Sequence, residues 1–272
     1  MTHIGAYRIV RPLARGAFCD AFEATRTMPG LPDCTVTLKT LRHVDRESIA
    51  RFHRAAHVNA YLNHAHIPAV FEFGESDGTL YMARMFIDGD DVLNGVRNRT
   101  RTFNGVVSLC AQIASALDDA HAHGIIHGLV HPRHILVDKG GKAWLIGFGE
   151  YPIWGPLSGN PIHWAPEQLE GGATKLPATD VYLLAETALW LLAGRHPFAP
   201  ERGVDSIAVK QKSEFAQPIS VLVPGITSRA VDAFTRALDP NPARRHVSVC
   251  DFVEDLADAT TERRAWWRQL WQ

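Results

Sequence analysis

The sequence predicts an α+β fold of two lobes, a small β-rich lobe first and a larger helical lobe second. The first ninety residues mostly form short β-like stretches bounded by turns, whereas the later residues place apolar side chains at helical spacing. Residues 181–193 are apolar on every side, which predicts a buried helix in the second lobe. We expect one domain over residues 1–272, with a first lobe at about 1–88, a second at about 89–260 and a terminal helix at about 261–272.

The first lobe combines several predicted strands with one predicted helix. Within residues 47–62, Ile49, Phe52, Ala56 and Ala60 recur at the spacing of one helix face. Alternating or β-rich runs bounded by turn residues predict strands elsewhere. These strands are expected at 7–13, 21–27, 35–41, 69–73 and 79–87.

In the second lobe, the apolar period changes to that of helices after residues 88–91. Val106, Leu109, Ile113 and Leu117 share one face of a predicted amphipathic helix that ends at Gly124. Two short strands and three further helices should follow it. We expect the strands at 135–137 and 143–146, and the helices at 181–193, 228–238 and 248–259.

Composition excludes several classes of protein. The 272 residues carry 28 Lys and Arg against 29 Asp and Glu, a net charge of −1, so no strong positive field favours nucleic acid or an anionic membrane. Four scattered cysteines without a C-x-x-C pair are typical of reduced thiols in a cytosolic protein. We therefore expect a cytoplasmic chain, or the cytosolic part of a membrane-anchored protein if it is a fragment.

Several short motifs follow one another in a characteristic order. They are TVTLK at 35–39, FHRAA at 52–56, LNH at 62–64, IHGLVHPRHIL at 126–136, GFG at 147–149, APE at 165–167, DVY at 180–182, GRHPF at 194–198 and NPARR at 241–245. In this order they resemble the protein kinases, and among them the bacterial Ser/Thr kinases of the eukaryotic type. The resemblance covers roughly residues 7–256 and implies a bilobal protein-kinase-like fold.

The same resemblance implies that most catalytic positions are substituted. Phosphoryl transfer depends on positioning and on charge stabilisation by magnesium, lysine and a base. The catalytic Asp, its neighbouring Lys, the magnesium-binding Asn, the D-F-G Asp and the helix Glu correspond to Leu129, His131, His134, Gly147 and Ala55. Of the family's catalytic set, only the ATP-site lysine is kept, as Lys39.

The nucleotide pocket implied by the resemblance is altered as well. The glycine-rich loop falls on Ala14, Gly16 and Cys19, so side chains at two of three positions hinder approach of backbone amides to phosphate. The gatekeeper position corresponds to Arg84, which would enter the back of the adenine pocket near Lys39. Glu150 is a candidate anion for these two cations. The alternative is that Arg84 points into solvent.

Structural positions of the family are kept, by the same resemblance. It implies an ion pair of Glu167 with Arg245 and support of the catalytic-loop backbone by Asp180. It also places His127 and Phe148 in the hydrophobic column that joins the lobes. These residues are expected to maintain the fold.

Taken together, the kept frame and the substituted positions imply a pseudokinase. We expect a catalytically inactive domain, not an enzyme, that serves as a protein-binding scaffold or regulator in bacterial signalling, with no cofactor. The alternative is a divergent Ser/Thr protein kinase, or an ATP-binding sensor, that uses ATP and magnesium with non-standard residues such as His131 or His134.

Five histidines lie close together along the chain and suggest two interpretations. A zinc site is one, because imidazole is a common zinc ligand. Hydrogen-bonded structural histidines are the other, which we favour because no cysteine or carboxylate is placed to complete a tetrahedron. The five are His121, His123, His127, His131 and His134.

The C-terminus is rich in tryptophan and arginine. Trp266, Trp267, Leu270 and Trp271 share one helical face. The segment is interpreted as a docking helix for another protein or a second copy of the chain, or as a juxtamembrane segment. A last helix that folds back on the second lobe is the alternative.

Overall fold

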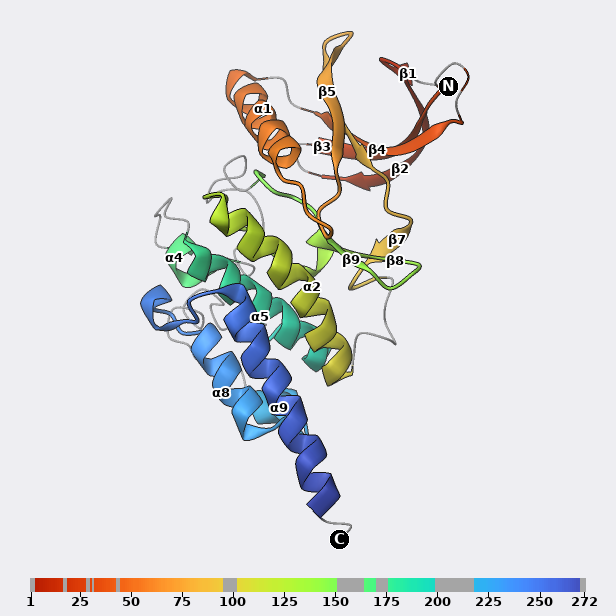
Figure 1. Ribbon diagram of the computed structural model, residues 1–272. Coiled ribbons are helices and arrows are strands. Elements are labelled where there is room, and N and C mark those ends of the chain that lie inside the picture. The colour runs from red at the N-terminus through yellow and green to blue at the C-terminus, as the bar shows by residue number, and fades with distance from the viewer. Residues whose placement is uncertain are drawn as a thin grey trace.

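The structure is a computed structural model with two lobes, one above the other in Figure 1. It describes residues 3–16, 19–27, 30, 32–42, 45–94, 102–150, 164–169, 176–198 and 218–269, and for residues 260–269 only the backbone. The first lobe holds a curled sheet and one helix, and the second is mainly helical. The predicted α+β architecture is therefore confirmed.

The sheet of the first lobe has six antiparallel strands in the order β1-β2-β3-β4-β6-β5. One face of this sheet carries the buried residues Val36 and Leu38 of β4 and Ala83 of the neighbouring β6. The strand bounds are β1 His3–Ile4, β2 Tyr7–Arg15, β3 Cys19–Arg26, β4 Cys34–Leu41, β5 Val70–Ser76 and β6 Thr79–Met85.

Helix α1, Arg46–Tyr61, lies beside this sheet (Figure 1). The Asp45 carboxylate caps its first turn by accepting hydrogen bonds from the backbone N–H groups of Glu47 and Ser48, at 3.0 and 2.8 Å. Phe52 and Ala56 are buried with strand residues in one apolar cluster. The helix is thereby held on the sheet.

A three-stranded sheet, β7-β8-β9, lies between the large sheet and the helices (Figure 1). The helices of the second lobe enclose the main apolar core, in which α5 is buried along nearly its whole length. The bounds are β7 Gly89–Asp91, α2 Phe103–Ala122, η1 Pro132–His134, β8 Ile135–Asp138, β9 Ala143–Leu145, α4 Pro166–Leu169, α5 Pro177–Ala193, α7 Ile219–Leu222, α8 Ser228–Ala237, η4 Pro242–Arg244 and α9 Val249–Gln269.

Element boundaries differ from the predicted ones for local reasons. Strand β2 continues to Arg15 because Ala14 and Arg15 still pair with β3. Helix α2 begins at Phe103, where the Thr102 hydroxyl accepts the N–H of Gly105 at 3.1 Å. The Asp118 carboxylate accepts the first N–H groups of α9 at 3.0 and 2.9 Å, so a residue of α2 caps another helix.

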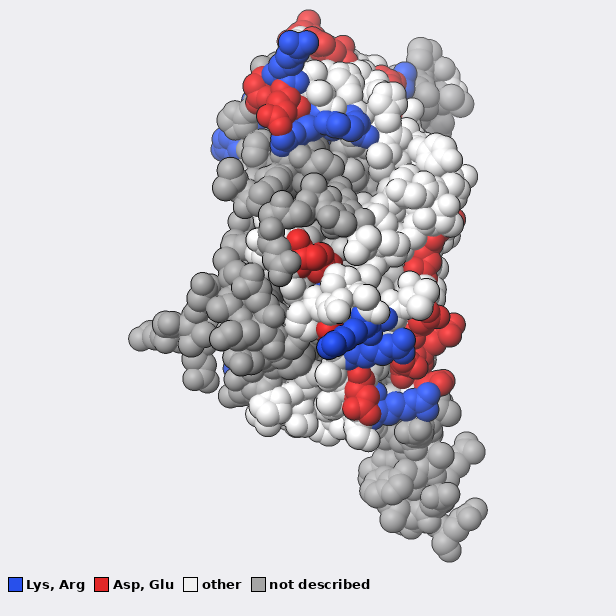
Figure 2. Space-filling view, turned by 90° about the vertical axis from the view of Figure 1, so that its left-hand side faces the viewer, with Lys and Arg blue, Asp and Glu red and all other residues white. Residues whose placement is uncertain are grey.

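The surface carries both signs of charge. On the face shown in Figure 2, Lys and Arg side chains lie among Asp and Glu at the top of the view and again in its lower half. This distribution agrees with the net charge of −1. Among the described residues, no helix is long and apolar enough to cross a membrane.

Candidate functional site

The centre of the site is an ion pair between Lys39 of β4 and Glu150. The Lys39 ammonium donates to the Glu150 carboxylate, and the two side chains are only 15% and 13% exposed. Burial raises the pKa of Glu150, but Lys39, His134 and Arg84 outweigh it and hold that pKa at about 2. Glu150 is therefore ionised at neutral pH.

The lysine takes its partner from the segment after Gly149, because α1 offers none at Ala55. A Cβ on Gly149 would lie 2.8 Å from the Cα of Ala55, so the two backbones are in close contact. The Asn59 amide fixes this contact by donating to the carbonyls of Ala55 and Phe148, each at 2.7 Å. Small residues at 55 and 149 thus bring the chain that carries Glu150 against the helix.

Arg84 of β6 lies on the same face of the sheet as Lys39. Thr37 pairs with Arg84 and Lys39 pairs with Met82, and residues two apart on a strand share a face. Arg84 is only 7% exposed, so it does not point into solvent. Burial lowers the pKa of Arg84, and the charge of Glu150 opposes that effect.

The loop after α2 places two imidazole rings together. The rings of His131 and His134 have centroids 3.9 Å apart. His134 Nδ1 lies 2.7 Å from the carbonyl oxygen of Leu129, which assigns the proton to Nδ1. Burial lowers the pKa of His134 to about 4, so this ring is neutral at pH 7.

Gly147 faces the ring of His134. Its φ is +100°, and a Cβ there would lie 3.0 Å from two ring atoms of His134. A carboxylate at position 147 would therefore need both a strained backbone and a displaced imidazole. The glycine at 147 therefore leaves the space that the imidazole of His134 occupies.

The turn between β2 and β3 needs its remaining glycine. The Gly16 N–H donates to the Cys19 carbonyl at 2.9 Å, and a Cβ at Gly16 would lie 2.7 Å from that oxygen. Cys19 is buried, and burial raises the pKa of its thiol to about 11. The thiol is therefore protonated at neutral pH despite the nearby Lys39.

The family's magnesium does not fit the residues at its usual place. Magnesium prefers carboxylate oxygens in a near-octahedral set. Gly147 offers no side chain, and His134 offers a neutral imidazole whose Nδ1–H is bonded to Leu129. Within the described part of the chain, no group of three or more His, Cys, Asp and Glu could hold a metal ion.

The histidines of the zinc hypothesis are engaged in separate structural contacts. His121 Nε2 lies 2.8 Å from the Asp180 carboxylate, and His123 Nδ1 lies 2.8 Å from the Asp119 carbonyl. His127 Nε2 lies 3.0 Å from the Ile146 carbonyl, and its ring centroid is 4.6 Å from that of Phe148. His127 and Phe148 are thus in contact between the loops, as the resemblance implies.

Asp180, at the start of α5, supports the catalytic-loop backbone. Its carboxylate accepts the N–H of His127 at 2.9 Å and that of Gly128 at 2.7 Å. His121 bridges Asp180 and Asp118, 2.8 and 3.5 Å away. The loop is thereby tied to both α2 and α5.

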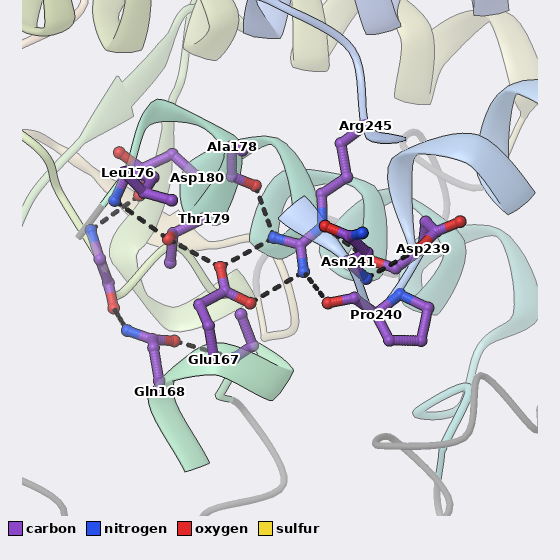
Figure 3. A network of polar contacts seen from close by, with 12 residues as sticks. Glu167, Gln168, Leu176, Ala178, Thr179, Asp180, Asp239, Pro240, Asn241 and Arg245 are labelled. Carbon is purple, nitrogen blue, oxygen red and sulfur yellow. Dashed lines mark hydrogen bonds and ion pairs between the residues drawn. The ribbon is translucent and has the colours of Figure 1, made fainter. Parts of the chain in front are cut away.

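Glu167 and Arg245 form a bidentate ion pair (Figure 3). Both bonds are 2.8 Å long, and Thr179 donates to the same carboxylate at 2.8 Å. Arg245 also donates to the carbonyls of Ala178, Asp239 and Pro240 at 2.8–3.2 Å. The network joins the α4 segment, α5 and the η4 segment.

Sequence reasoning missed two residues that hold the site together. Asn59 clamps the Phe148 segment to α1. Gln168 accepts the N–H of Ala165 at 2.8 Å and donates to the carbonyl of Gly128 at 2.9 Å. Both amides are buried in the structure, where buried polar groups are normally hydrogen-bonded, and that burial is not evident from their sequence neighbours.

The predictions for the C-terminal segment fall outside the described side chains. Helix α9 continues to Gln269, so the backbone of Trp266 and Trp267 is helical. Nothing is described for their side chains or for Leu270 and Trp271.

Comparison with known proteins assigns the family. A protein kinase domain matches residues 7–272. The chain belongs to the protein kinase family. This kinase-family chain is 30% identical over 279 residues to the serine/threonine-protein kinase PknA of Mycobacterium tuberculosis, covering 97% of this chain and 63% of PknA. It is 28% identical to the probable serine/threonine-protein kinase PknB of Lactococcus lactis, covering 94% of this chain and 42% of PknB.

A solved structure shows the same fold. The crystal structure of the Mycobacterium tuberculosis PknI kinase domain matches with a TM-score of 0.74 and 29% identity, covering 95% of this chain and 98% of that one. The predicted protein kinase fold and the bacterial Ser/Thr kinase resemblance are confirmed. This kinase domain spans about 42–63% of the length of the two curated relatives named above.

One expectation is wrong. We expected a chain that is not an enzyme, but its relatives over 94–97% of its length are named serine/threonine-protein kinases, and the kinase domain spans residues 7–272. The expectation counted only the family's own catalytic positions, such as Gly147. The described residues also include a carboxylate outside these positions, Glu150, which is paired with Lys39.

Likewise, the family normally uses ATP with magnesium, so the expectation of no cofactor does not hold for the family as a whole. In this chain, the ATP-site position of the family holds Lys39, which is paired with Glu150.

Proposed function

We propose that this kinase-family domain acts in bacterial signalling as a regulator that binds another protein. The proposal rests on one observation: the structural residues of the kinase family are kept, whereas its acidic catalytic residues are substituted. The frame of the second lobe is kept, as in the Glu167–Arg245 pair and the Asp180 bonds, whereas Leu129 and Gly147 stand where the family has acidic groups. The proposed role is to bind another protein, and the same chain could also transfer phosphate.

Composition indicates the class of partner. A net charge of −1 with mixed surface charge gives no field for nucleic acid, which leaves a protein as the expected partner. Tryptophan and arginine dominate the hot spots of protein interfaces. Trp266, Trp267, Leu270 and Trp271 are spaced along the sequence to share one helix face, which makes the C-terminal segment our candidate for contact.

The test is proximity labelling in a bacterial host, comparing the full chain with a chain truncated after Glu262. The proposal expects a defined neighbour that is labelled by the full chain and lost on truncation, while the melting temperature stays unchanged. Sedimentation of the purified full chain detects a second copy as that neighbour. Identical labelling by both chains, with no association in either, would remove the C-terminal segment as the binding element. If no neighbour exceeds an unrelated control protein in either chain, the regulator proposal itself fails.

A divergent Ser/Thr protein kinase is the second candidate. The relatives' names favour it, and so does the position of Glu150, an ionised carboxylate beside Lys39 in the cleft. Radiolabelled phosphate transfer to the chain itself and to generic substrates measures it, with Lys39→Met as the matched control. Incorporation above that control supports this candidate, and incorporation equal to the control removes it.

A further inference from the structure

Asp118 of α2 holds the first turn of α9. Its Oδ1 accepts the N–H of Val249 at 3.0 Å, and its Oδ2 accepts the N–H of Cys250 at 2.9 Å. The first N–H groups of a helix lack partners within that helix, and the helix dipole favours a negative charge beside them. The start of α9 therefore depends on a charge that another helix supplies.

Asp180 of α5 holds the loop after α2 in a similar way. Its carboxylate accepts the N–H of His127 at 2.9 Å and the N–H of Gly128 at 2.7 Å. The Asp180 side chain is fully buried. Since a buried charge depends on its partners, these two loop bonds respond to whatever else Asp180 contacts.

His121 lies between the two carboxylates and faces one with each ring nitrogen. Nε2 is 2.8 Å from Asp180 Oδ2, and Nδ1 is 3.5 Å from Asp118 Oδ1. These are the same oxygens that accept the N–H groups of His127 and Val249. A neutral imidazole carries one N–H and an imidazolium carries two, so only the charged ring presents a proton to both carboxylates.

The groups around His121 favour this charged form. Burial lowers the pKa of His121, but Asp118 and Asp180 outweigh it and raise that pKa to about 9. From α9, the Cys250 thiol lies beside Asp118, and burial raises its pKa to about 12, so it is neutral. The loop at 123–131 contains no Asp, Glu, Lys or Arg, and its titratable side chains are three histidines.

We infer that protonated His121 couples the start of α9 to the loop at 127–128, because one imidazolium holds both the Asp118 and the Asp180 carboxylate. While the ring is charged, a change at the start of α9 alters the N–H bonds of the loop. When the proton leaves, the two ends respond separately. The inference goes beyond partner binding and does not depend on it.

The coupling follows from the sharing of one cation. If the start of α9 moves away, Asp118 loses two N–H donors and draws more strongly on His121. Asp180 then receives less from the ring, and its bonds to the loop change. The route begins in the helix whose C-terminal part we propose as the contact for a partner, and it ends at the loop that carries Leu129.

The experiment is a double-mutant cycle on the whole chain, followed by amide hydrogen exchange in NMR spectra at pH 7. Asp118→Asn removes the charge at the start of α9 and keeps the shape of the side chain. In that variant, we expect the Gly128 N–H to exchange at least about fivefold faster relative to the Leu145 N–H. The Leu145 N–H donates to the His66 carbonyl at 2.8 Å and corrects for changes in global stability.

Two variants separate coupling from a simple loosening of α9. Asp251→Asn removes another carboxylate at the start of α9, one that accepts the Ser248 N–H at 3.0 Å. This matched control should leave the relative exchange of Gly128 unchanged. In a His121→Gln chain, Asp118→Asn should lose its effect on Gly128, because glutamine carries no charge to transmit it.

A pH titration of the wild type keeps the test sharp if a variant is unstable. The imidazole C–H signals of His121 report its proton, and the backbone amide signals of Gly128 and Cys250 report the two ends. Both amide signals should shift with the midpoint of His121, close to pH 9. The N–H of Asp251, which donates to the Ser248 hydroxyl at 3.0 Å, should not follow that midpoint.

Three results would overturn the inference. The first is a Gly128 exchange rate that Asp118→Asn leaves unchanged, or that Asp251→Asn raises as much. The second is an undiminished effect of Asp118→Asn in the His121→Gln chain. The third is a pair of amide signals, from Gly128 and Cys250, that titrate with different midpoints. Each would show that the carboxylates act as separate caps, and none changes the labelling pattern that tests partner binding.

Discussion

Replacing Glu167 by glutamine should destabilise the second lobe strongly. The change keeps the shape of the side chain but removes the charge that neutralises Arg245, whose side chain is fully buried. Three backbone carbonyls would remain as partners of the guanidinium, and none carries a full negative charge. Breaking a buried pair from one side costs about 3–5 kcal/mol. At about 2–4 °C per kcal/mol for a chain of this size class, the melting temperature should fall by roughly 10 °C.

The assay is thermal unfolding followed by circular dichroism, with Lys139→Gln as the control. Lys139 pairs with Asp88 at 2.6 Å, but the two side chains are 80% and 64% exposed. Exposed pairs contribute at most about 1 kcal/mol, so the control should melt within a few degrees of the wild type. Equal melting temperatures for Glu167→Gln and Lys139→Gln would refute the reasoning, because burial would then not decide the strength of these pairs.

The same pair predicts a dependence on pH. Burial raises the pKa of Glu167, but its bonds to Arg245 outweigh burial and lower that pKa overall. A depressed folded-state pKa contributes stability above the unfolded pKa of about 4.3, and this stability is lost as the pH falls through the folded value. The difference in stability between wild type and Glu167→Gln should therefore shrink in acid. A difference that stays constant down to pH 2 would contradict the assignment.

Three further predictions concern the site and its support. Burial lowers the pKa of His121, but hydrogen bonds to two aspartates raise it to about 9. The stability that His121 contributes is therefore full below about pH 6.5 and is lost as the pH rises through 9. Between about pH 6 and 9.5, the melting temperature of the wild type should fall more than that of His121→Gln. Gly147→Asp should cost about 1–3 kcal/mol because of its positive φ and the contact with His134, and adding His134→Asn should recover part of that in denaturant unfolding. Ala55→Glu should cost about 1–3 kcal/mol by overpacking the contact with Gly149, and an unchanged urea midpoint would show that the helix shifts freely.

The sequence predicted well those features whose residues stand in recognisable motifs or apolar runs. The Glu167–Arg245 pair and the Asp180 bonds followed from the APE, NPARR and DVY motifs, and the structure contains both. The buried helix α5 followed from a run with no polar face. In each case a short motif or run marks each residue involved, even where the two partners, such as Glu167 and Arg245, lie 78 residues apart.

The sequence named Glu150 as a candidate partner of Lys39, and the structure contains that pair. The packing that places Glu150 there could not be predicted, because it depends on small residues far apart in the chain. Taken alone, Ala55 is a missing glutamate and Gly149 a turn residue. In the structure they are two sides of one contact, with a Cβ on Gly149 only 2.8 Å from the Ala55 Cα. Asn59 closes the same contact across 89 residues of sequence.

The consequence for function is that the lysine has exchanged its partner rather than lost it. A carboxylate on α1 would hold Lys39 from the helix side, whereas Glu150 holds it from the segment that follows GFG. The exchange also brings Arg84 and His134 under the influence of the same carboxylate. A substitution that looks like loss at each position separately is therefore, in three dimensions, a different arrangement of charge in the cleft.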